Sequence, residues 1–179
     1  MEQTRAILLR RHPWSETSLI VSWLTENHGT LRTSARGARR PGSPFAGKLD
    51  LFFQAEISFA VSRKGGDLHE LREVSVIAPF EAARAGGAGL YMAAYFAELA
   101  GQCAPSMHPA AEIYDLLRRA LNFLQSKPAT EAALHHFERE LARILGVHDP
   151  SGLIGAREGL ASLGGGILRS RAAALRFFS

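Results

Sequence analysis

Residues 33–43 read TSARGARRPGS, and the fold is best understood by working outward from this stretch. Five basic side chains and no acidic one lie between Arg32 and Lys48, and glycine and proline interrupt the run halfway along it. This composition suits neither a buried strand nor a long helix. We therefore predict that a strand leaves a sheet here and continues into an exposed basic loop.

Upstream of the loop, the hydrophobic pattern predicts three short strands. An apolar run at 6–11 is followed by Pro13, which is not compatible with a central strand and indicates a turn. A second run at 18–25 ends in a hairpin turn, where Gly29 is suited to a positive φ. Beyond Gly29, side chains alternate between a core face and a wet, basic face. The core face carries Leu31, Thr33 and Ala35, and the wet face carries Arg32, Ser34 and Arg36.

Downstream of the loop, two further strands are predicted. In residues 51–62, apolar side chains alternate with polar ones. The apolar set is Phe53, Ala55, Ile57, Phe59 and Val61, and the opposing set is Gln54, Glu56, Ser58 and Ser62. A turn at 63–67 leads to a fifth strand at 68–76. Five short strands, joined by tight turns and one longer basic loop, predict a small barrel of the oligonucleotide-binding (OB) type.

After residue 79 the hydrophobic period changes from that of a strand to that of a helix. Helices are predicted at 90–102, 113–124 and 130–145, with shorter ones at 152–163 and 167–178. The predicted fold class is α+β, with an N-terminal five-stranded OB-fold barrel followed by a C-terminal all-helical domain. We place the two domains at residues 1–79 and 80–179.

The composition is that of an ordinary globular protein with a basic balance. Hydrophobic residues make up 46% of the 179 residues, the formal net charge is +4 and the sequence pI is about 9.7. This balance favours a polyanionic partner. The single cysteine, Cys103, excludes an internal disulfide and a multi-cysteine zinc cluster, and no run reaches the ~20 apolar residues of a membrane span. We therefore expect a cytoplasmic protein that is neither exported nor embedded in a membrane.

The basic loop is the leading candidate for a binding site. Guanidinium groups pair with phosphates in a planar, two-point fashion and release counterions when they do so. The same composition also fits a loop that is merely soluble, and the residues alone do not separate the two. Phe45, Phe52 and Phe59 offer stacking surfaces for unpaired bases, with Phe45 favoured because it lies in the loop, although aromatic residues at alternating strand positions are more often core.

Patterns that indicate catalysis or metal binding are weak. His135 and His136 adjoin one another, so on a helix their side chains point about 100° apart, which does not suit a tetrahedral site. The glycines at 86–89 lack the Lys-Ser/Thr of a phosphate-binding loop and indicate a linker. No Ser, His and acid grouping has a recognisable nucleophile context. We expect a protein that is not an enzyme and that uses no metal or other cofactor.

A second candidate site consists of arginines next to apolar helix faces. They are Arg118, Arg119, Arg139 and Arg143. Such an arrangement suits an acidic, hydrophobic peptide tail. A solvated helix face is the commoner explanation of residues of this kind, and both interpretations are kept.

The order of several short motifs resembles the RecO family of recombination mediators. The motifs are AILLRR at 6–11, WSET at 14–17, LTENHG at 24–29 and ARGARRP at 35–41. Residues 35–43 are similar to the family's Ala-Lys-Gly-Ala-Arg signature, with Arg36 in the Lys position. FERELARILG at 137–146 is similar to the helix that closes the family's helical bundle. The resemblance covers about residues 5–148.

This resemblance implies a protein of the RecF pathway of DNA repair and recombination, located in the cytoplasm in association with the nucleoid. It implies binding of single- and double-stranded DNA, annealing of complementary strands, contact with the C-terminal tail of single-stranded-DNA-binding protein (SSB) and, with RecR, help in loading RecA. No cofactor is consumed in those steps. The DNA contacts that it implies are Arg32, Arg36, Arg39, Arg40, Lys48, Arg63 and Lys64. By the same resemblance, the SSB tail docks at the four helical arginines.

Two features depart from the family pattern. Many members carry a four-cysteine zinc cluster soon after the helix that ends at Gly146, whereas residues 147–152 contain no cysteine. The sequence also ends at Ser179, earlier than members with further C-terminal helices. We therefore expect a helical bundle that is shortened or completed by a partner.

Three rival functions belong to other classes. A generic OB-fold single-stranded nucleic-acid-binding protein shares the barrel and the basic loop but has less reason to carry a helical domain. A nucleic-acid enzyme is expected to turn over a labelled strand in the presence of a divalent metal. A protein-binding scaffold is expected to bind DNA without salt dependence, or not at all.

Overall fold

The computed structural model describes residues 1–62, 65–148, 155–162 and 169–178. The chain forms two compact units. The first consists of Met1–Phe80 with Ala104–Tyr114, and the second of Glu81–Cys103 with Asp115–Ser179. Each unit is described separately below, and the domain division at residue 79 stays a prediction.

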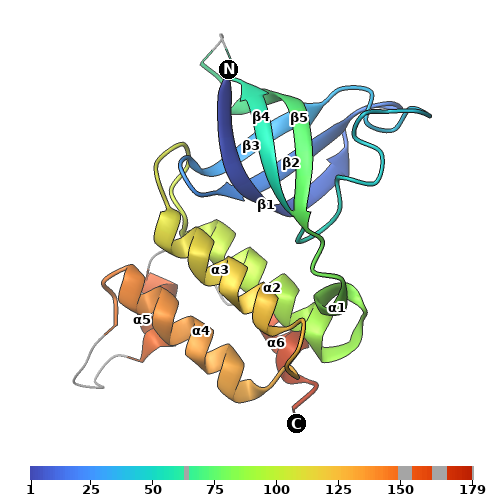
Figure 1. Ribbon diagram of the computed structural model, residues 1–179. Coiled ribbons are helices and arrows are strands. Elements are labelled where there is room, and N and C mark those ends of the chain that lie inside the picture. Colours follow the sequence, from blue (N-terminus) through green and yellow to red (C-terminus); the bar gives the residue numbers. More distant parts are fainter. Residues whose placement is uncertain (63–64, 149–154, 163–168, 179) are drawn as a thin grey trace. The chain divides into compact units, whose positions relative to one another are not determined.

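The first unit is a closed five-stranded barrel (Figure 1). Its strands are β1 (Glu2–Pro13), β2 (Leu19–Thr25), β3 (Gly29–Ala35), β4 (Gln54–Ala60) and β5 (Leu68–Ala78). They pair in the order β1-β2-β3-β5-β4, and β4 returns to β1 to close the barrel. All pairs are antiparallel except β3 with β5. The predicted OB barrel is confirmed.

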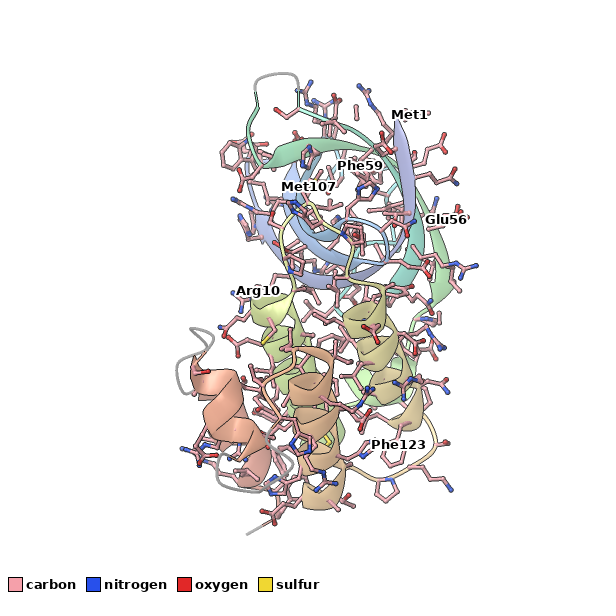
Figure 2. The ribbon with its side chains drawn as sticks, turned by 90° about the vertical axis from the view of Figure 1, so that its left-hand side faces the viewer. Met1, Arg10, Glu56, Phe59, Met107 and Phe123 are labelled. Atoms are coloured by element: carbon pink, nitrogen blue, oxygen red, sulfur yellow. The ribbon has the colours of Figure 1, made fainter. Side chains whose placement is uncertain are left out.

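The barrel core follows the predicted alternation of side chains only in part, because the polar residues Gln54 and Ser58 of β4 are buried as well. Trp23 is fully buried, and its indole Nε1 donates a 2.9 Å hydrogen bond to Thr33 Oγ1. Phe59 lies inside the barrel and Glu56 projects from its outer surface (Figure 2). Val61 is an exception because β4 ends at Ala60, and its side chain is 48% exposed.

The first strand is longer than the sequence indicates. β1 continues to Pro13, which pairs with Leu19 as the last residue of the strand. A proline is tolerated at a strand end because its missing N–H interrupts no further pairing. The turn begins one residue later, where the Trp14 backbone N–H donates to Ser18 O at 2.9 Å.

Residues 104–110 connect two helices in sequence, and together with the first residues of the second of these helices, 111–114, they pack in the barrel unit. Pro105 O accepts a hydrogen bond from Thr30 N at 2.8 Å, and Met107 N donates to Thr30 O at 3.2 Å. Gly29 lies beneath this segment with a φ of +58°, which confirms the predicted positive-φ hairpin position. A Cβ at Gly29 would lie 2.0 Å from Pro105 O and 2.5 Å from His108 O. The absence of a side chain at this position therefore allows the segment to cover the β2–β3 hairpin.

The second unit is helical, as predicted. Its helices are α1 (Glu81–Arg84), α2 (Gly87–Cys103), α4 (Glu131–Ile144), α5 (Ala156–Ser162) and α6 (Arg169–Leu175), together with most of α3 (Ala111–Phe123), which begins in the first unit. α2 packs against α1, α4 and α6, and α4 packs against α5. Phe96 of α2 stacks on Phe137 of α4 with their ring centroids 4.1 Å apart. Residues 152–154 and 163 of one predicted helix, and 167–168 of the next, lie outside the described residues.

A buried carboxylate joins three of these helices. Glu138 of α4 is 3% exposed, and its Oε1 accepts 2.6 Å hydrogen bonds from Tyr95 Oη of α2 and Arg171 Nε of α6. Burial raises the pKa of Glu138, but the hydrogen bonds from Arg171 and Tyr95 and the charge of Arg171 outweigh this effect and lower it. Glu138 is therefore held in its ionised form.

The N-terminus of α4 offers a small stability test. Thr130 is the N-cap, and its side-chain oxygen accepts a hydrogen bond from Ala133 N at 3.2 Å. Thr130→Ala is expected to lower the free energy of unfolding of the helical unit by about 1 kcal/mol because this donor loses its partner. Chemical denaturation followed by far-UV circular dichroism measures the loss. Thr130→Ser keeps the hydroxyl and should stay near wild type, and an equal loss in both variants would contradict the capping role.

No helix in the described part of the chain is long and apolar enough to cross a membrane.

Candidate nucleic-acid interface

The first half of the basic loop is fixed to the β1–β2 turn. Arg39 N donates to Thr17 O at 2.9 Å, and Arg39 Nη1 donates to Ser15 O at 3.0 Å. Gly37 N donates to Ser18 Oγ at 3.3 Å. The two segments project together from one side of the barrel, at the right in Figure 1. The predicted exposed basic loop is confirmed, and hydrogen bonds to the turn hold it in place.

The second half of the loop turns back into the barrel core. Phe45 is 6% exposed and Phe52 is 2% exposed, and both pack among buried residues. Phe52 adopts a φ of +65° and its N–H donates to Leu8 O at 2.9 Å, while Leu8 N donates to Phe53 O at 3.0 Å. Phe59 is completely buried. Of the two interpretations that the sequence left open for these phenylalanines, the core role therefore applies, because all three side chains are buried.

The loop arginines differ in how much of their charge is already paired. Arg32 makes an ion pair with Asp67 at 2.9 Å and is half-exposed. The Arg36 side chain is 77% exposed and lies 3.8 Å from Glu70, whose other carboxylate oxygen pairs with Arg72 at 2.9 Å. Arg36 is therefore available to an external anion to a greater extent than Arg32.

The remaining predicted cations fall into three groups. Arg39 and Arg40 are exposed, and within the described residues Arg40 has no side-chain hydrogen bond or ion pair. Lys48 is half-buried at the point where the loop returns to the core. Arg63 and Lys64 lie outside the described residues. The structure thus places Arg36, Arg39 and Arg40 on one exposed segment.

A cavity of about 170 Å³ lies between the basic loop and strands β1 and β2. Leu19 and the loop residues Ala38 and Phe45 line its apolar part. At its rim, Arg11 donates to Leu49 O at 2.7 Å and makes an ion pair with Asp50 at 3.0 Å. The positive charge of Arg11 is therefore already balanced by the carboxylate of Asp50.

Three of the four helical arginines are engaged in local ion pairs. Arg118 and Arg119 share Asp115, at 2.6 Å and 2.8 Å, and Arg143 pairs with Glu140 at 3.2 Å. The hydrogen bond from Arg118 is the largest influence on the pKa of Asp115 and lowers it. Burial opposes this effect by a smaller amount, and the hydrogen bond from Arg119 lowers the pKa further. These are exposed pairs of one helical turn, which contribute little stability.

Arg139 is the exposed member of the set for which the described residues provide no ion pair. Arg118 and Arg119 lie on α3, whereas Arg139 and Arg143 lie on α4. Each of the three ion pairs joins residues of the same helix. Within the described part of the chain, no ion pair links the arginines of α3 to those of α4.

Trp14 lies next to the basic loop in the fold but is not among the residues that the sequence predicts to contact DNA. It lies in the β1–β2 turn, its side chain is 64% exposed, and the turn carries the hydrogen bonds to Arg39. The sequence held a usable signal, because an aromatic residue between Pro13 and Ser15 in a predicted turn has no strand face on which to be buried.

Among the described residues, no group of three or more His, Cys, Asp or Glu side chains is placed to hold a metal ion. His135 contacts Glu131 and Glu138 at 3.4 Å and 3.2 Å, and all three residues lie on α4.

The strand order, the closed barrel and the helices that follow define an OB-fold protein with a C-terminal helical region. The chain belongs to the RecO family of DNA repair proteins. The family model "Recombination protein O N terminal" matches residues 1–80, and "Recombination protein O C terminal" matches residues 85–148. The family resemblance seen in the sequence is confirmed.

Several curated relatives named "DNA repair protein RecO" are similar to this chain. One from Rhodopirellula baltica is 32% identical over 146 residues, which cover 82% of this chain and 53% of the relative. One from Anaeromyxobacter dehalogenans is 35% identical over 143 residues, covering 79% and 55%. One from Xanthomonas campestris pv. campestris is 32% identical over 157 residues, covering 85% and 64%. The matched part therefore spans between about half and two thirds of these relatives' length.

Proposed function

We propose that this protein is a DNA repair and recombination mediator that binds single- and double-stranded DNA and anneals complementary strands. With RecR and SSB it promotes loading of RecA, in the cytoplasm and in association with the nucleoid. One observation carries the DNA-binding part: three exposed arginines lie on a loop that is hydrogen-bonded to the β1–β2 turn of an OB barrel. The loops of OB folds are common sites of oligonucleotide binding. The RecO family membership and the names of the relatives support the wider role.

The proposed mechanism requires neutralisation of charge without reading of sequence. Arg36, Arg39 and Arg40 present guanidinium groups that pair with phosphate oxygens. We propose that Arg32 and Lys48 add further positive charge, and that Arg63 and Lys64, which lie outside the described residues, also contact DNA. Two approaching strands repel each other through their phosphates, and bound cations reduce this repulsion. Base pairing then drives annealing. None of these steps consumes a cofactor or requires catalytic turnover.

We assign DNA binding to residues 1–79 and partner binding to residues 80–179. The acidic SSB tail is proposed to contact Arg118, Arg119, Arg139 and Arg143. Arg139 is the most accessible of these cations, since the other three already have carboxylate partners that a tail must displace. We therefore expect Arg139 to contribute more to the affinity for the SSB tail than Arg118, Arg119 or Arg143.

The combined change of Arg36, Arg39 and Arg40 to Ala tests the DNA site. We expect weaker binding to both single and double strands, slower annealing, and a salt dependence of log K that is shallower by about 2–3 units, because each lost phosphate contact removes about 0.7–0.9. Fluorescence polarisation with labelled DNA over a range of salt concentrations measures these changes.

A matched control removes the same number of charges elsewhere. Arg118, Arg119 and Arg143, all changed to Ala, lower the net charge equally and should leave bare-DNA binding close to wild type. Wild-type affinity and salt slope in the loop variant, with its circular dichroism unchanged, would exclude the loop as the DNA site.

The helical arginines distinguish a mediator from a generic single-strand binder. Changing all four to Ala is expected to impair annealing of SSB-coated strands while bare strands still anneal. Point variants serve this purpose better than deletion of residues 80–179, because the deletion also removes residues 104–114, which pack in the barrel unit. Turnover of a labelled strand in the presence of a divalent metal would instead favour a nucleic-acid enzyme. DNA binding that does not depend on salt would favour a protein-binding scaffold.

A further inference from the structure

Trp14 exposes a large aromatic ring at a fixed position on the barrel unit. Its side chain is 64% exposed, whereas Trp23, the other tryptophan, is completely buried. The Trp14 backbone N–H donates to Ser18 O at 2.9 Å, which closes the turn. No hydrogen bond or ring contact of the Trp14 indole occurs within the described part of the chain. The ring is therefore free to meet a ligand while its backbone is held.

The turn that carries Trp14 is hydrogen-bonded to the basic loop. Ser15, the next residue, accepts from Arg39 Nη1, and Thr17 accepts from Arg39 N at 2.9 Å. Ser18 Oγ accepts from Gly37 N. The Trp14 ring and the exposed guanidinium groups therefore lie on two segments that these hydrogen bonds join. The segments cannot move independently without breaking the bonds.

An exposed tryptophan and a basic loop together suit a single nucleic-acid strand, which has both charged phosphates and unpaired bases. Its phosphates require positive charge, and its unpaired bases present apolar faces that stack on aromatic rings. The bases of an intact duplex already stack on one another, so a duplex offers the charge without the free faces. The phenylalanines of this region are buried in the core, which leaves Trp14 as the aromatic ring that the β1–β2 turn and the basic loop present to a strand.

We propose that Trp14 stacks on an unpaired base of a strand whose phosphates lie on Arg36, Arg39 and Arg40. This inference rests on the proposed DNA binding and deepens it, because it adds a preference for single strands and assigns that preference to one residue. The loop arginines contribute to the affinity for both single- and double-stranded DNA. Trp14 contributes only to the affinity for a strand with accessible bases.

Intrinsic fluorescence of the full chain provides the test. Oligothymidine and a duplex of equal length are titrated into the protein while tryptophan emission and polarisation of labelled DNA are followed. We expect oligothymidine to quench the tryptophan emission of the wild-type protein and the duplex to quench it much less. The emission of Trp14→Ala, which comes from Trp23 alone, should stay constant with either DNA. In Trp14→Ala, affinity for oligothymidine should fall on the order of tenfold. Affinity for the duplex should stay within about twofold, and the salt slope should not change, because no phosphate contact is lost.

The outcomes separate the two levels of the proposal. Oligothymidine binding without quenching of Trp14, or an equal loss for both DNAs in Trp14→Ala, would overturn the stacking role and leave the proposed DNA binding intact. Absence of DNA binding by the wild-type protein would overturn both. Trp23 remains in Trp14→Ala as a reporter of the barrel core, so the short-wavelength emission of a buried tryptophan, which is lost when urea is added, shows that the barrel is folded. Trp14→Phe, which keeps a smaller ring, should retain part of the affinity.

Discussion

Gly29→Ala is expected to lower the free energy of unfolding of the barrel unit by roughly 3–4 kcal/mol. A residue with a side chain in the left-handed region costs about 1–2 kcal/mol. The added Cβ also falls 2.0 Å from Pro105 O and 2.5 Å from His108 O, both of them backbone atoms that cannot turn aside. The covering segment must move away, and the two backbone hydrogen bonds between Thr30 and this segment, of about 1 kcal/mol each, are lost.

Urea denaturation followed by Trp23 emission measures this loss, since Trp23 is buried in the barrel core. Gly42→Ala is the matched control. Gly42 has a φ of +71°, but nothing lies within 4 Å of the position of its Cβ. The control therefore carries the backbone strain without the clash, and should cost about 1–2 kcal/mol. If both variants lose the same stability, the close approach of residues 105–108 to the hairpin is not important for the fold.

Glu138→Gln is expected to destabilise the helical unit by about 3 kcal/mol at neutral pH, because removal of one partner leaves a poorly solvated charge on Arg171. The Arg171 side chain is only 15% exposed, and the carboxylate of Glu138 accepts from both its Nε and its Nη2. The helical signal in circular dichroism is followed separately from Trp23 emission, because two compact units need not unfold together. Glu140→Gln, which weakens the exposed pair with Arg143, should cost less than about 1 kcal/mol.

The cost of Glu138→Gln is expected to depend on pH in a defined direction. The folded pKa of Glu138 lies below its ordinary value of 4.5, so the ionised carboxylate stabilises the fold at pH values above 4.5. This contribution is lost as the pH falls through the lower folded pKa. The stability difference between wild type and Glu138→Gln should therefore shrink as the solution is acidified below pH 4.5. A difference that stays constant through the acid range would mean that the charge of Glu138 is not the source of its effect.

Local patterns in the sequence were sufficient to predict the barrel strands and the main helices. Alternation from Gly29 to Ala35 identifies the buried face of β3 because a strand side chain has only two directions. Repeats at three and four residues identify α3 and α4 in the same way. The position of the basic loop follows from the absence of any apolar period between residues 36 and 44.

Features that depend on distant residues were not predictable from such patterns. Phe45 lies in loop-like sequence, and its burial results from the return of the loop to the barrel. Glu138 and Arg171 are far apart in sequence, and the burial of both is visible only when α4 and α6 are placed together. Within the candidate site, the loop arginines were predicted by charge alone. The bonds from Arg39 to the β1–β2 turn, which bring Trp14 into the site, required the structure.

The return of residues 104–114 to the barrel unit has a consequence for the order of events during translation. All five strands have left the ribosome's catalytic centre once Ala78 is joined to the chain, yet the segment that covers Gly29 has not been synthesised. The hairpin at Gly29 stays uncovered until residues 105–110 have been synthesised and have also left the ribosome, when Ala110 N can donate to Glu26 O. Completion of the N-terminal unit is thus tied to synthesis of α2, a helix that belongs to the other unit.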